Sequence, residues 1–284
     1  MEGTVRRGRF FMFNAILPTS LTLDILICTI DDRIGRVVDV LLPPMEGVRW
    51  VVSMQYTDER MLERVPTVLR ERTDVTLCFL PGRGLCRNRN HALRQAQGDI
   101  VLIADDDCRY TAEGLQSVVR KFEMRPDVDI ICFAAESHEG VPLKAYPATP
   151  QSYETARKEG YFPASVEMSM RRGLGILFDE RFGLGSERLC AGEEEVFMKD
   201  ATSCGYRALV CPTVIVRTCG DTTGSRFVGN RRMQLTKGAT FRYVFGTYGA
   251  IWRTVKEAGW WLVKEKANPI PILYNMLRGI WILQ

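Results

Sequence analysis

Histidine is scarce in this chain, which has only His91 and His138 among its 284 residues. A zinc site or a histidine-based catalytic triad is therefore nearly excluded. Nine cysteines are an odd number, none forms a Cys-x-x-Cys pair, and their spacing is not that of metal ligands. Cys28, Cys78 and Cys132 lie within apolar runs, where a thiol serves as a small hydrophobic side chain. This cysteine usage favours a reducing cytoplasm.

The chain also lacks any apolar run long enough for a membrane span. The N-terminus has basic residues before a short apolar run but no small-residue cleavage site, so we do not expect a signal peptide. Internal repeats and low-complexity segments are absent as well. Hydrophobic residues make up 46% and charged residues 25%, as in an ordinary soluble globular protein. The length allows one large domain, with or without an appendage, around a sizeable core.

Charge is spread unevenly along the chain. Residues 225–284 hold ten Lys and Arg but only two Asp and Glu, whereas the whole chain has a net charge of +4. The remainder is therefore mildly acidic. A basic tail on an acidic body favours an anionic surface as partner, membrane headgroups before nucleic acid. A merely solvated basic face is the alternative.

Apolar runs and helical patterns alternate in the first half of the chain. Strands are predicted over residues 21–30, 48–56, 74–81, 99–104 and 129–136. One helix is predicted from residue 84 until Gly98 stops it, and a second begins after Thr111 as its cap. The buried stripe of that second helix should comprise Leu115, Val118, Val119 and Phe122. Such alternation predicts a mostly parallel sheet with helices on both faces, which binds ligands beyond the carboxyl ends of its strands.

Three adjacent aspartates, Asp105, Asp106 and Asp107, directly follow the run 99–104. Their carboxylates repel one another, so a metal ion, a basic neighbour or water must compensate them. Two carboxylates separated by one residue can point at one hard cation that also binds substrate phosphates. A metal there would neutralise the charge that builds on a departing diphosphate. Asp-x-Asp also occurs in caps, calcium loops and phosphatases, so a structural role stays open.

A second acidic cluster, residues 193–195, heads a helical pattern in which Val196, Phe197 and Ala201 recur on the apolar side. Acidic residues in a first turn are favoured by the helix dipole alone, which is the structural interpretation. The functional interpretation is a general base at a helix N-terminus, positioned to take a proton from a hydroxyl.

Together, these motifs resemble the family-2 glycosyltransferases of the GT-A fold, particularly those that build bacterial surface polysaccharides. The resemblance covers roughly residues 21–224. It rests, in chain order, on "LDILICTIDDR", "GLCRNRNHALRQAQGDIVLIADDD", "SVEMSMRR", "FDERFGLGSERLCAGEEEVF" and "PTVIVRTCGDTTG". It implies an α/β, Rossmann-like catalytic domain over 21–224, with an N-terminal arm over 1–20. Residues 225–284 then form a basic, aromatic, helical C-terminal extension.

The resemblance also implies a metal and a catalytic base. Asp107 would ligate Mg²⁺ or Mn²⁺ directly, and Asp105 would hold the donor ribose or a metal-bound water. The acidic pair of the family falls on Glu193 and Glu194, with Glu194 as the inverting base. The pair here is Glu-Glu where the family has Glu-Asp. Where the family often has a histidine as third metal ligand, this chain has Thr218, so the metal is held more loosely, Asp221 substitutes, or activity is impaired.

A nucleotide-binding set follows from the same resemblance. Thr29 and Asp32 fall in the loop that contacts the base, and Gln55 lies near the position of a uracil-binding aspartate in the family. Arg89 and Asn90 match an Arg-Asn signature near the donor, and an exposed helix face is their structural alternative.

The implied function is an inverting hexosyl- or N-acetylhexosaminyltransferase. It would move a sugar from a nucleotide-diphospho-sugar, by family habit a UDP-sugar, to a hydroxyl of a glycan or lipid-linked acceptor. The expected location is the cytoplasm, peripheral at the inner face of the cell membrane, without nucleic acid as a partner. A nucleotidyltransferase would need a Gly-rich loop after the first strand, and an aspartate-nucleophile phosphatase an early Asp-x-Asp-x-Thr; neither occurs. A decayed, non-catalytic binding or assembly protein is the alternative from another class.

The tail carries a helical stripe of apolar residues. It comprises Phe241, Val244, Phe245, Tyr248, Ile251, Trp252 and Val255. Arg242, Arg253 and Lys256 lie among the polar positions, and Pro269 and Pro271 precede a second apolar segment, 272–283. The pattern predicts an amphipathic helix that lies in the headgroup region of a membrane. Packing of the stripe on the catalytic domain or on a second subunit is the alternative.

Overall fold

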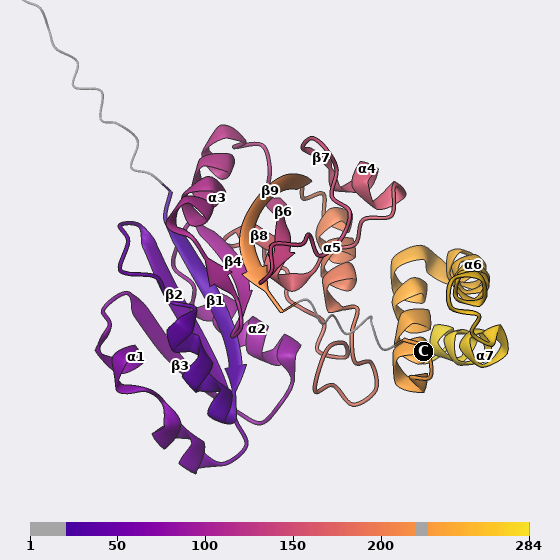
Figure 1. The fold of residues 1–284 in the computed structure, drawn as a ribbon, viewed down its shortest axis with the longest axis horizontal. Helices are drawn as coiled ribbons and strands as arrows, with labels where there is room; N and C mark the ends of the chain where they lie inside the picture. The colour runs from indigo at the N-terminus through magenta and orange to yellow at the C-terminus, as the bar shows by residue number, and fades with distance from the viewer. Residues whose placement is uncertain (1–20, 220–226, 284) are drawn as a thin grey trace, which may run out of the picture.

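The structure, a computed structural model, describes residues 21–219 and 227–283. A nine-stranded sheet lies at its centre (Figure 1). The strands are β1 (Leu23–Ile30), β2 (Val48–Tyr56), β3 (Val75–Pro81), β4 (Ile100–Asp105), β5 (Arg109–Tyr110), β6 (Ile130–Ser137), β7 (Gln151–Ser152), β8 (Met168–Arg171) and β9 (Ala208–Thr218). Their order is β3-β2-β1-β4-β8-β6-β9-β5, and β7 pairs with β9. The five predicted strands correspond to β1, β2, β3, β4 and β6.

The long strands point the same way. β1, β2, β3 and β4 pair in parallel, and so do β6 and β9. The short β8 lies antiparallel between β4 and β6 and joins the two parallel groups. The carboxyl ends of β4 and β9 therefore meet at one edge of the sheet. The predicted mostly parallel sheet is confirmed.

Helices cover both faces of the sheet. They are α1 (Thr67–Glu71), α2 (Leu85–Gln95), α3 (Ala112–Met124), α4 (Tyr153–Lys158) and α5 (Glu193–Ser203), with the 3₁₀ helices η1 (Asp31–Asp39), η2 (Glu59–Arg64) and η3 (Ser165–Glu167). Alternate residues of β1 enter two cores: Ile25 packs in the cluster with Phe122 of α3, and Leu26 packs in the cluster with Phe197 of α5. A strand that is buried on both sides reads as a continuous apolar run, which is why β1 was predictable.

Two local predictions had different outcomes. Thr111 caps α3, because its Oγ1 accepts a hydrogen bond of 3.0 Å from the amide of Gly114. Val119, expected in the buried stripe of α3, is only partly buried. The prediction that Gly98 stops α2 was wrong, since the helix ends at Gln95. Gly98 instead lies against Asp24 of β1, where a Cβ atom would collide with the carboxylate and backbone of that residue.

Two further helices, α6 (Arg231–Glu265) and α7 (Pro269–Ile280), lie beside the sheet domain. α6 is not continuous, because Gly246 adopts φ 72° and ψ 179°, and the segments on either side run in different directions (Figure 1). The first segment docks on α5: Tyr243 donates a hydrogen bond of 2.9 Å to Asp200. Close packing of α6 on α7 requires Gly238, at which a Cβ atom would collide with the backbone of α7.

The bend at Gly246 divides the predicted tail stripe. Phe241 and Val244, before the bend, are buried, whereas Tyr248, Trp252 and Val255, after it, are exposed. The expected single amphipathic helix is therefore two segments with different environments. No helix in the described ranges is long and apolar enough to cross a membrane. The division of the chain at residues 224 and 225 stays a prediction.

Candidate active site

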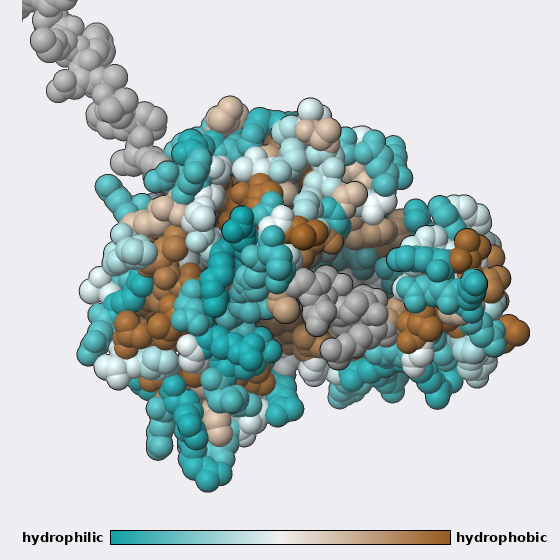
Figure 2. Space-filling model, in the orientation of Figure 1, coloured by the Kyte–Doolittle hydropathy of each residue, from teal (hydrophilic) through white to brown (hydrophobic). Residues whose placement is uncertain are grey.

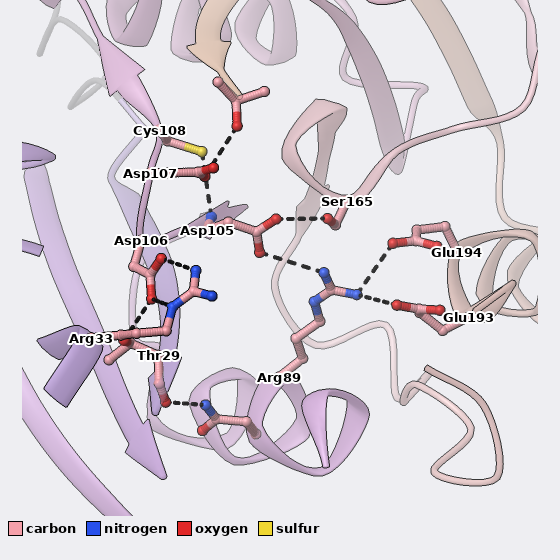
Figure 3. Close-up of polar contacts among 12 residues, drawn as sticks. Thr29, Arg33, Arg89, Asp105, Asp106, Asp107, Cys108, Ser165, Glu193 and Glu194 are labelled. Carbon is pink, nitrogen blue, oxygen red and sulfur yellow. Dashed lines mark hydrogen bonds and ion pairs between the residues drawn. The ribbon is translucent and has the colours of Figure 1, made fainter. Parts of the chain in front are cut away.

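A cavity of about 560 Å³ opens where the carboxyl ends of β4 and β9 meet the N-terminus of α5. Its walls come from segments far apart in the sequence. The polar residues that line it include Arg89, Asp105, Asp107, Lys144, Ser165, Glu193, Glu194, Glu195, Thr218, Thr236, Lys237 and Thr240. Both predicted acidic clusters therefore face one space (Figure 3).

Asp106, the middle aspartate, does not face the cavity, and a basic neighbour compensates it. Its buried carboxylate accepts a hydrogen bond of 2.8 Å from Nε of Arg33 and one of 2.7 Å from Oγ1 of Thr29 (Figure 3). Asp105 and Asp107, on either side, are left to line the cavity. The role of Arg33 was not predicted. Two features of the sequence could have indicated it: three adjacent aspartates need a compensating cation, and an arginine lies in the loop after the first strand.

The residues predicted to contact the base lie at the ends of β1 and β2. The hydroxyl of Thr29 is used to hold Asp106, so the structure gives Thr29 a positioning role. Asp32 is exposed in the first turn of η1. Gln55 is buried at the end of β2, and its Nε2 has no hydrogen-bond partner among the residues that the structure describes. Asn88 was missed: its Nδ2 donates to the carbonyls of Thr29 (3.1 Å) and Ser53 (3.0 Å) and fixes the two strand ends together.

Arg89 connects the two acidic clusters. Its guanidinium lies 3.5 Å from Asp105, 3.2 Å from Glu193 and 3.3 Å from Glu194, and its side chain is buried (Figure 3). Burial alone lowers the pKa of Arg89, but the surrounding carboxylates outweigh it, so the pKa lies above its ordinary value. The alternative of an exposed helix face is thereby excluded for Arg89.

Asn90 holds a loop behind the cavity. Its Nδ2 donates to the carbonyl of Phe178 (2.9 Å) and to Glu180 (3.2 Å), and its Oδ1 accepts from the amide of Phe178 (2.8 Å). The ring of Phe178 in turn lies 5.3 Å from the guanidinium of Arg89. Asn90 is not among the residues that line the cavity. Its predicted role in donor binding stays a prediction.

Glu193 and Glu194 have different surroundings although they are adjacent. The side chain of Glu193 is 7% exposed and that of Glu194 is 17% exposed. Burial, and then the negative charge of Glu194, raise the pKa of Glu193 to about 8, although Arg89 opposes the shift. At neutral pH Glu193 therefore tends to hold a proton. Its Oε2 has no hydrogen-bond partner within the described part of the chain.

Asp105 and Asp107 fit a hard divalent cation. Asp107 accepts a hydrogen bond of 3.1 Å from Thr218. Within the described ranges, the carboxylate of Asp105 has only the long contacts to Ser165 and Arg89, each 3.5 Å. Withdrawal from bulk water, and then the charge of Asp107, raise the pKa of Asp105 despite Arg89. A cation would relieve this repulsion, and carboxylate oxygens are the ligands that Mg²⁺ and Mn²⁺ take.

The protein ligands for such a cation are few. Among the described residues, no group of three or more Asp, Glu, His or Cys side chains converges on one point. Asp221, predicted as a further ligand, lies outside the described residues. Two carboxylates suffice for Mg²⁺ where substrate phosphates and water complete the coordination.

The sequence interpretation missed the wall that α6 contributes to the cavity. Thr236, Lys237 and Thr240 line it, because the first segment of α6 packs across the N-terminus of α5. Nζ of Lys237 lies 5.3 Å from the ring centroids of Phe162 and Phe241. Lys237 lies before the apolar stripe predicted over residues 241–255, and nothing in its sequence neighbourhood indicated a place in this cavity.

Residues 57–175 match the family model described as glycosyl transferase family 2. The structure is similar to the crystal structure of Staphylococcus aureus TarS 1–349, with a TM-score of 0.58 and 15% identity over 92% of this chain and 81% of that one. The chain therefore has a GT-A fold. The resemblance seen in the sequence is confirmed.

Two other TarS structures match in the same way. TarS 1–349 in complex with UDP-GlcNAc gives a TM-score of 0.57 and 17% identity over 90% of this chain and 80% of that one. A longer TarS chain gives a TM-score of 0.52 and 16% identity over 85% of this chain. This chain spans only 44% of that longer protein. No curated protein matches the chain by sequence.

Proposed function

We propose that this chain is an inverting glycosyltransferase that moves a sugar from a nucleotide-diphospho-sugar to an acceptor hydroxyl. The observation that carries the proposal is the shared cavity: Asp105 and Asp107 line one part of it, Glu193 and Glu194 another, and Arg89 contacts both groups. Glycosyl transfer needs a site for the diphosphate and a base for the acceptor, with room between them for the sugar. A cavity of about 560 Å³ can hold a sugar residue with its diphosphate.

The donor proposed is a UDP-sugar, either hexosyl or N-acetylhexosaminyl. Support comes from the structural similarity to TarS, which was crystallised with UDP-GlcNAc. The base would lie near the ends of β1 and β2, where the unpartnered Nε2 of Gln55 can donate to a base carbonyl. Asp105 and Asp107 would hold Mg²⁺ or Mn²⁺, which when bound stabilises the negative charge of the departing diphosphate.

Glu194 is the proposed base. It takes the proton of the acceptor hydroxyl, whose oxygen then forms a bond to the anomeric carbon as the bond from that carbon to the diphosphate oxygen breaks. Attack from the face opposite the diphosphate inverts the anomeric configuration. Glu193, with its pKa raised to about 8, is poorly suited to accept this proton, because at neutral pH it already tends to hold one. Arg89 orients both carboxyl groups.

The proposed acceptor is a hydroxyl of a glycan or of a lipid-linked saccharide, reached from the cytoplasmic face of the membrane. A second candidate is a non-catalytic binding or assembly protein. The observation behind it is Thr218, which donates a hydrogen bond to Asp107 at the position where the family often has a metal-binding histidine.

The test is a calorimetric titration of the full chain with UDP, with and without Mn²⁺. We expect Mn²⁺ to tighten UDP binding to the wild type and to have no such effect on Asp107→Ala, while circular dichroism shows an intact fold. Asp39→Ala, which removes a largely exposed carboxylate outside the cavity, is the control and should behave as the wild type does. Equal, metal-independent affinity in wild type and Asp107→Ala would contradict the proposal. GDP and CDP in the same assay test the choice of base.

A further inference from the structure

The second segment of α6, residues 247–265, has two apolar faces. On one face Ala250 and Ala258 are buried in a cluster with Met276 of α7. On another face Tyr248, Trp252, Val255 and Val263 are exposed, at 91%, 61%, 57% and 83% of their surface. Spacings of four, three and eight residues place these side chains along one side of the helix. An ordinary surface helix has one apolar face, whereas this helix has a second one that is exposed in the described part of the chain.

The end of α6, α7 and the turn after α7 expose further apolar side chains. They are Trp260, Leu262, Ile270, Tyr274 and Trp281. Figure 2 shows apolar side chains at the outer edge of the two C-terminal helices, on the side away from the sheet. Aromatic residues are prominent among them, and tryptophan and tyrosine are the side chains that favour the interface between a bilayer and water.

Basic side chains lie next to these aromatic rings. Nζ of Lys256 is 5.4 Å from the ring centroid of Trp252, and Nζ of Lys264 is 4.4 Å from that of Trp260. On α7 the guanidinium of Arg278 is 5.7 Å from the ring centroid of Tyr274. On the second segment of α6 the cationic and apolar side chains thus lie next to one another. We call the surface formed by Tyr248, Trp252, Val255, Lys256, Trp260, Val263 and Lys264 the aromatic-basic face.

Charge selects the partner of the aromatic-basic face. Residues 247–283, which include this face, carry five Lys and Arg against Glu257 and Glu265, so two copies of this surface would repel each other. A nucleic acid would match the charge and leave the apolar stripe in water. An anionic bilayer matches both, since its headgroups attract Lys and Arg while its interface accepts Trp, Tyr and Val.

We propose that the aromatic-basic face docks in the headgroup region of an anionic lipid bilayer. The second segment of α6 then lies in the plane of the interface.

The same helix connects this surface to the active site. The first segment of α6 contributes Thr236, Lys237 and Thr240 to the cavity wall and is fixed to α5 through Tyr243 and Asp200. Docking of the second segment would therefore hold the acceptor side of the cavity close to the bilayer. This inference about the acceptor rests on the proposed function. Of the two acceptors proposed there, it favours the saccharide carried by a membrane lipid.

The experiment is co-sedimentation of the full chain with phosphatidylcholine vesicles, with and without phosphatidylglycerol, at low and high salt. We expect binding that requires phosphatidylglycerol and is lost at high salt. Val255→Glu should weaken it roughly tenfold, because a carboxylate replaces an inserted side chain and is repelled by the anionic surface. Val68→Glu is the matched control, an exposed valine on α1 of the catalytic domain, and should bind as the wild type does.

Three outcomes would overturn the proposal. They are a wild type that stays in the supernatant with anionic vesicles at low salt, equal weakening by both substitutions, or a dimer in solution that Val255→Glu dissociates. UDP binding, measured in parallel, separates this proposal from the proposed function. Vesicle binding without UDP binding would support the docking surface and contradict the proposed function. UDP binding without vesicle binding would support the proposed function and contradict the docking surface.

Discussion

Nη1 of Arg89 lies 3.2 Å from Oε1 of Glu193, and both side chains are buried. The same guanidinium contacts Asp105, so a change in one acidic cluster is felt by the other. A buried arginine between acidic groups is costly to remove, because Asp105 and Glu194 then lose the cation beside them in a poorly hydrated site.

Arg89→Met should therefore destabilise the fold strongly. Loss of one member of a buried ionic network costs about 3–5 kcal/mol of unfolding free energy. Urea denaturation followed by circular dichroism measures this. Arg94→Met, at an exposed position of the same helix, should stay within about 0.5 kcal/mol of the wild type. Equal midpoints for the two variants would show that the carboxylates do not depend on Arg89.

The pKa of Glu193 predicts how stability varies with pH. Its value rises from an ordinary 4.5 to about 8 in the folded state, so between these values only the unfolded chain has released the proton. The stability contributed by Glu193 is thus fully present below about pH 4.5 and is lost as pH rises through about 8. Glu193→Gln removes this titration. Unfolding free energies at several pH values should fall less steeply for the variant, and parallel curves would contradict the account.

Thr218 predicts a metal phenotype. If the missing imidazole only loosens the metal, Thr218→His should lower the Mn²⁺ concentration needed for half-maximal UDP release from a UDP-sugar. Thr218→Val is the control, since it removes the hydroxyl that donates to Asp107 without adding a ligand. No shift for Thr218→His, or inactivity at every Mn²⁺ concentration, would point to Asp221 as the ligand or to a metal-independent site.

The contact between Gly192 and α6 can be tested by its effect on stability. It has φ 86° and packs against Thr240 of α6, where a Cβ atom would collide with the threonine hydroxyl. Gly205 has φ 88° and open space around it. Both Gly→Ala changes should cost about 1–2 kcal/mol for the left-handed backbone conformation, and Gly192→Ala should cost more through the collision. Thermal unfolding measures the loss of stability in both variants. Equal losses would mean that Thr240 of α6 can move aside without cost.

Much of this fold could be predicted because four of its strands, β1, β2, β4 and β6, are buried on both faces. Their apolar runs are continuous, and Asp105 and Asp107 follow one of them directly, which placed the two carboxylates at the carboxyl edge of the sheet. The pairing of Asp106 with Arg33 could not be predicted, because it joins positions 73 residues apart through side chains alone. The bend at Gly246 was missed for a related reason: glycine permits a positive φ, and only the packing decides whether it is used.

The contacts of Asn90 and the position of Lys237 could not be predicted from the sequence either. A signature residue such as Asn90 can act through the loop that it holds, and its neighbours in space, Phe178 and Glu180, follow 88 and 90 residues later. Lys237 lines the cavity because the first segment of α6 packs against α5, a contact that neither helix pattern encodes.

The most direct test of Glu194 as the base is the release of UDP from UDP-GlcNAc in the presence of Mn²⁺, with water as acceptor. The assay compares the wild type with Glu→Gln variants at positions 193, 194, 195 and 187. Glu194→Gln should lose activity by roughly a hundredfold to ten-thousandfold, since the amide keeps the shape of the side chain and loses its basicity. Its calorimetric affinity for UDP should equal that of the wild type, and Glu187→Gln, at an exposed position, should be fully active. A fully active Glu194→Gln, or an inactive Glu193→Gln or Glu195→Gln in its place, would contradict the assignment of the base.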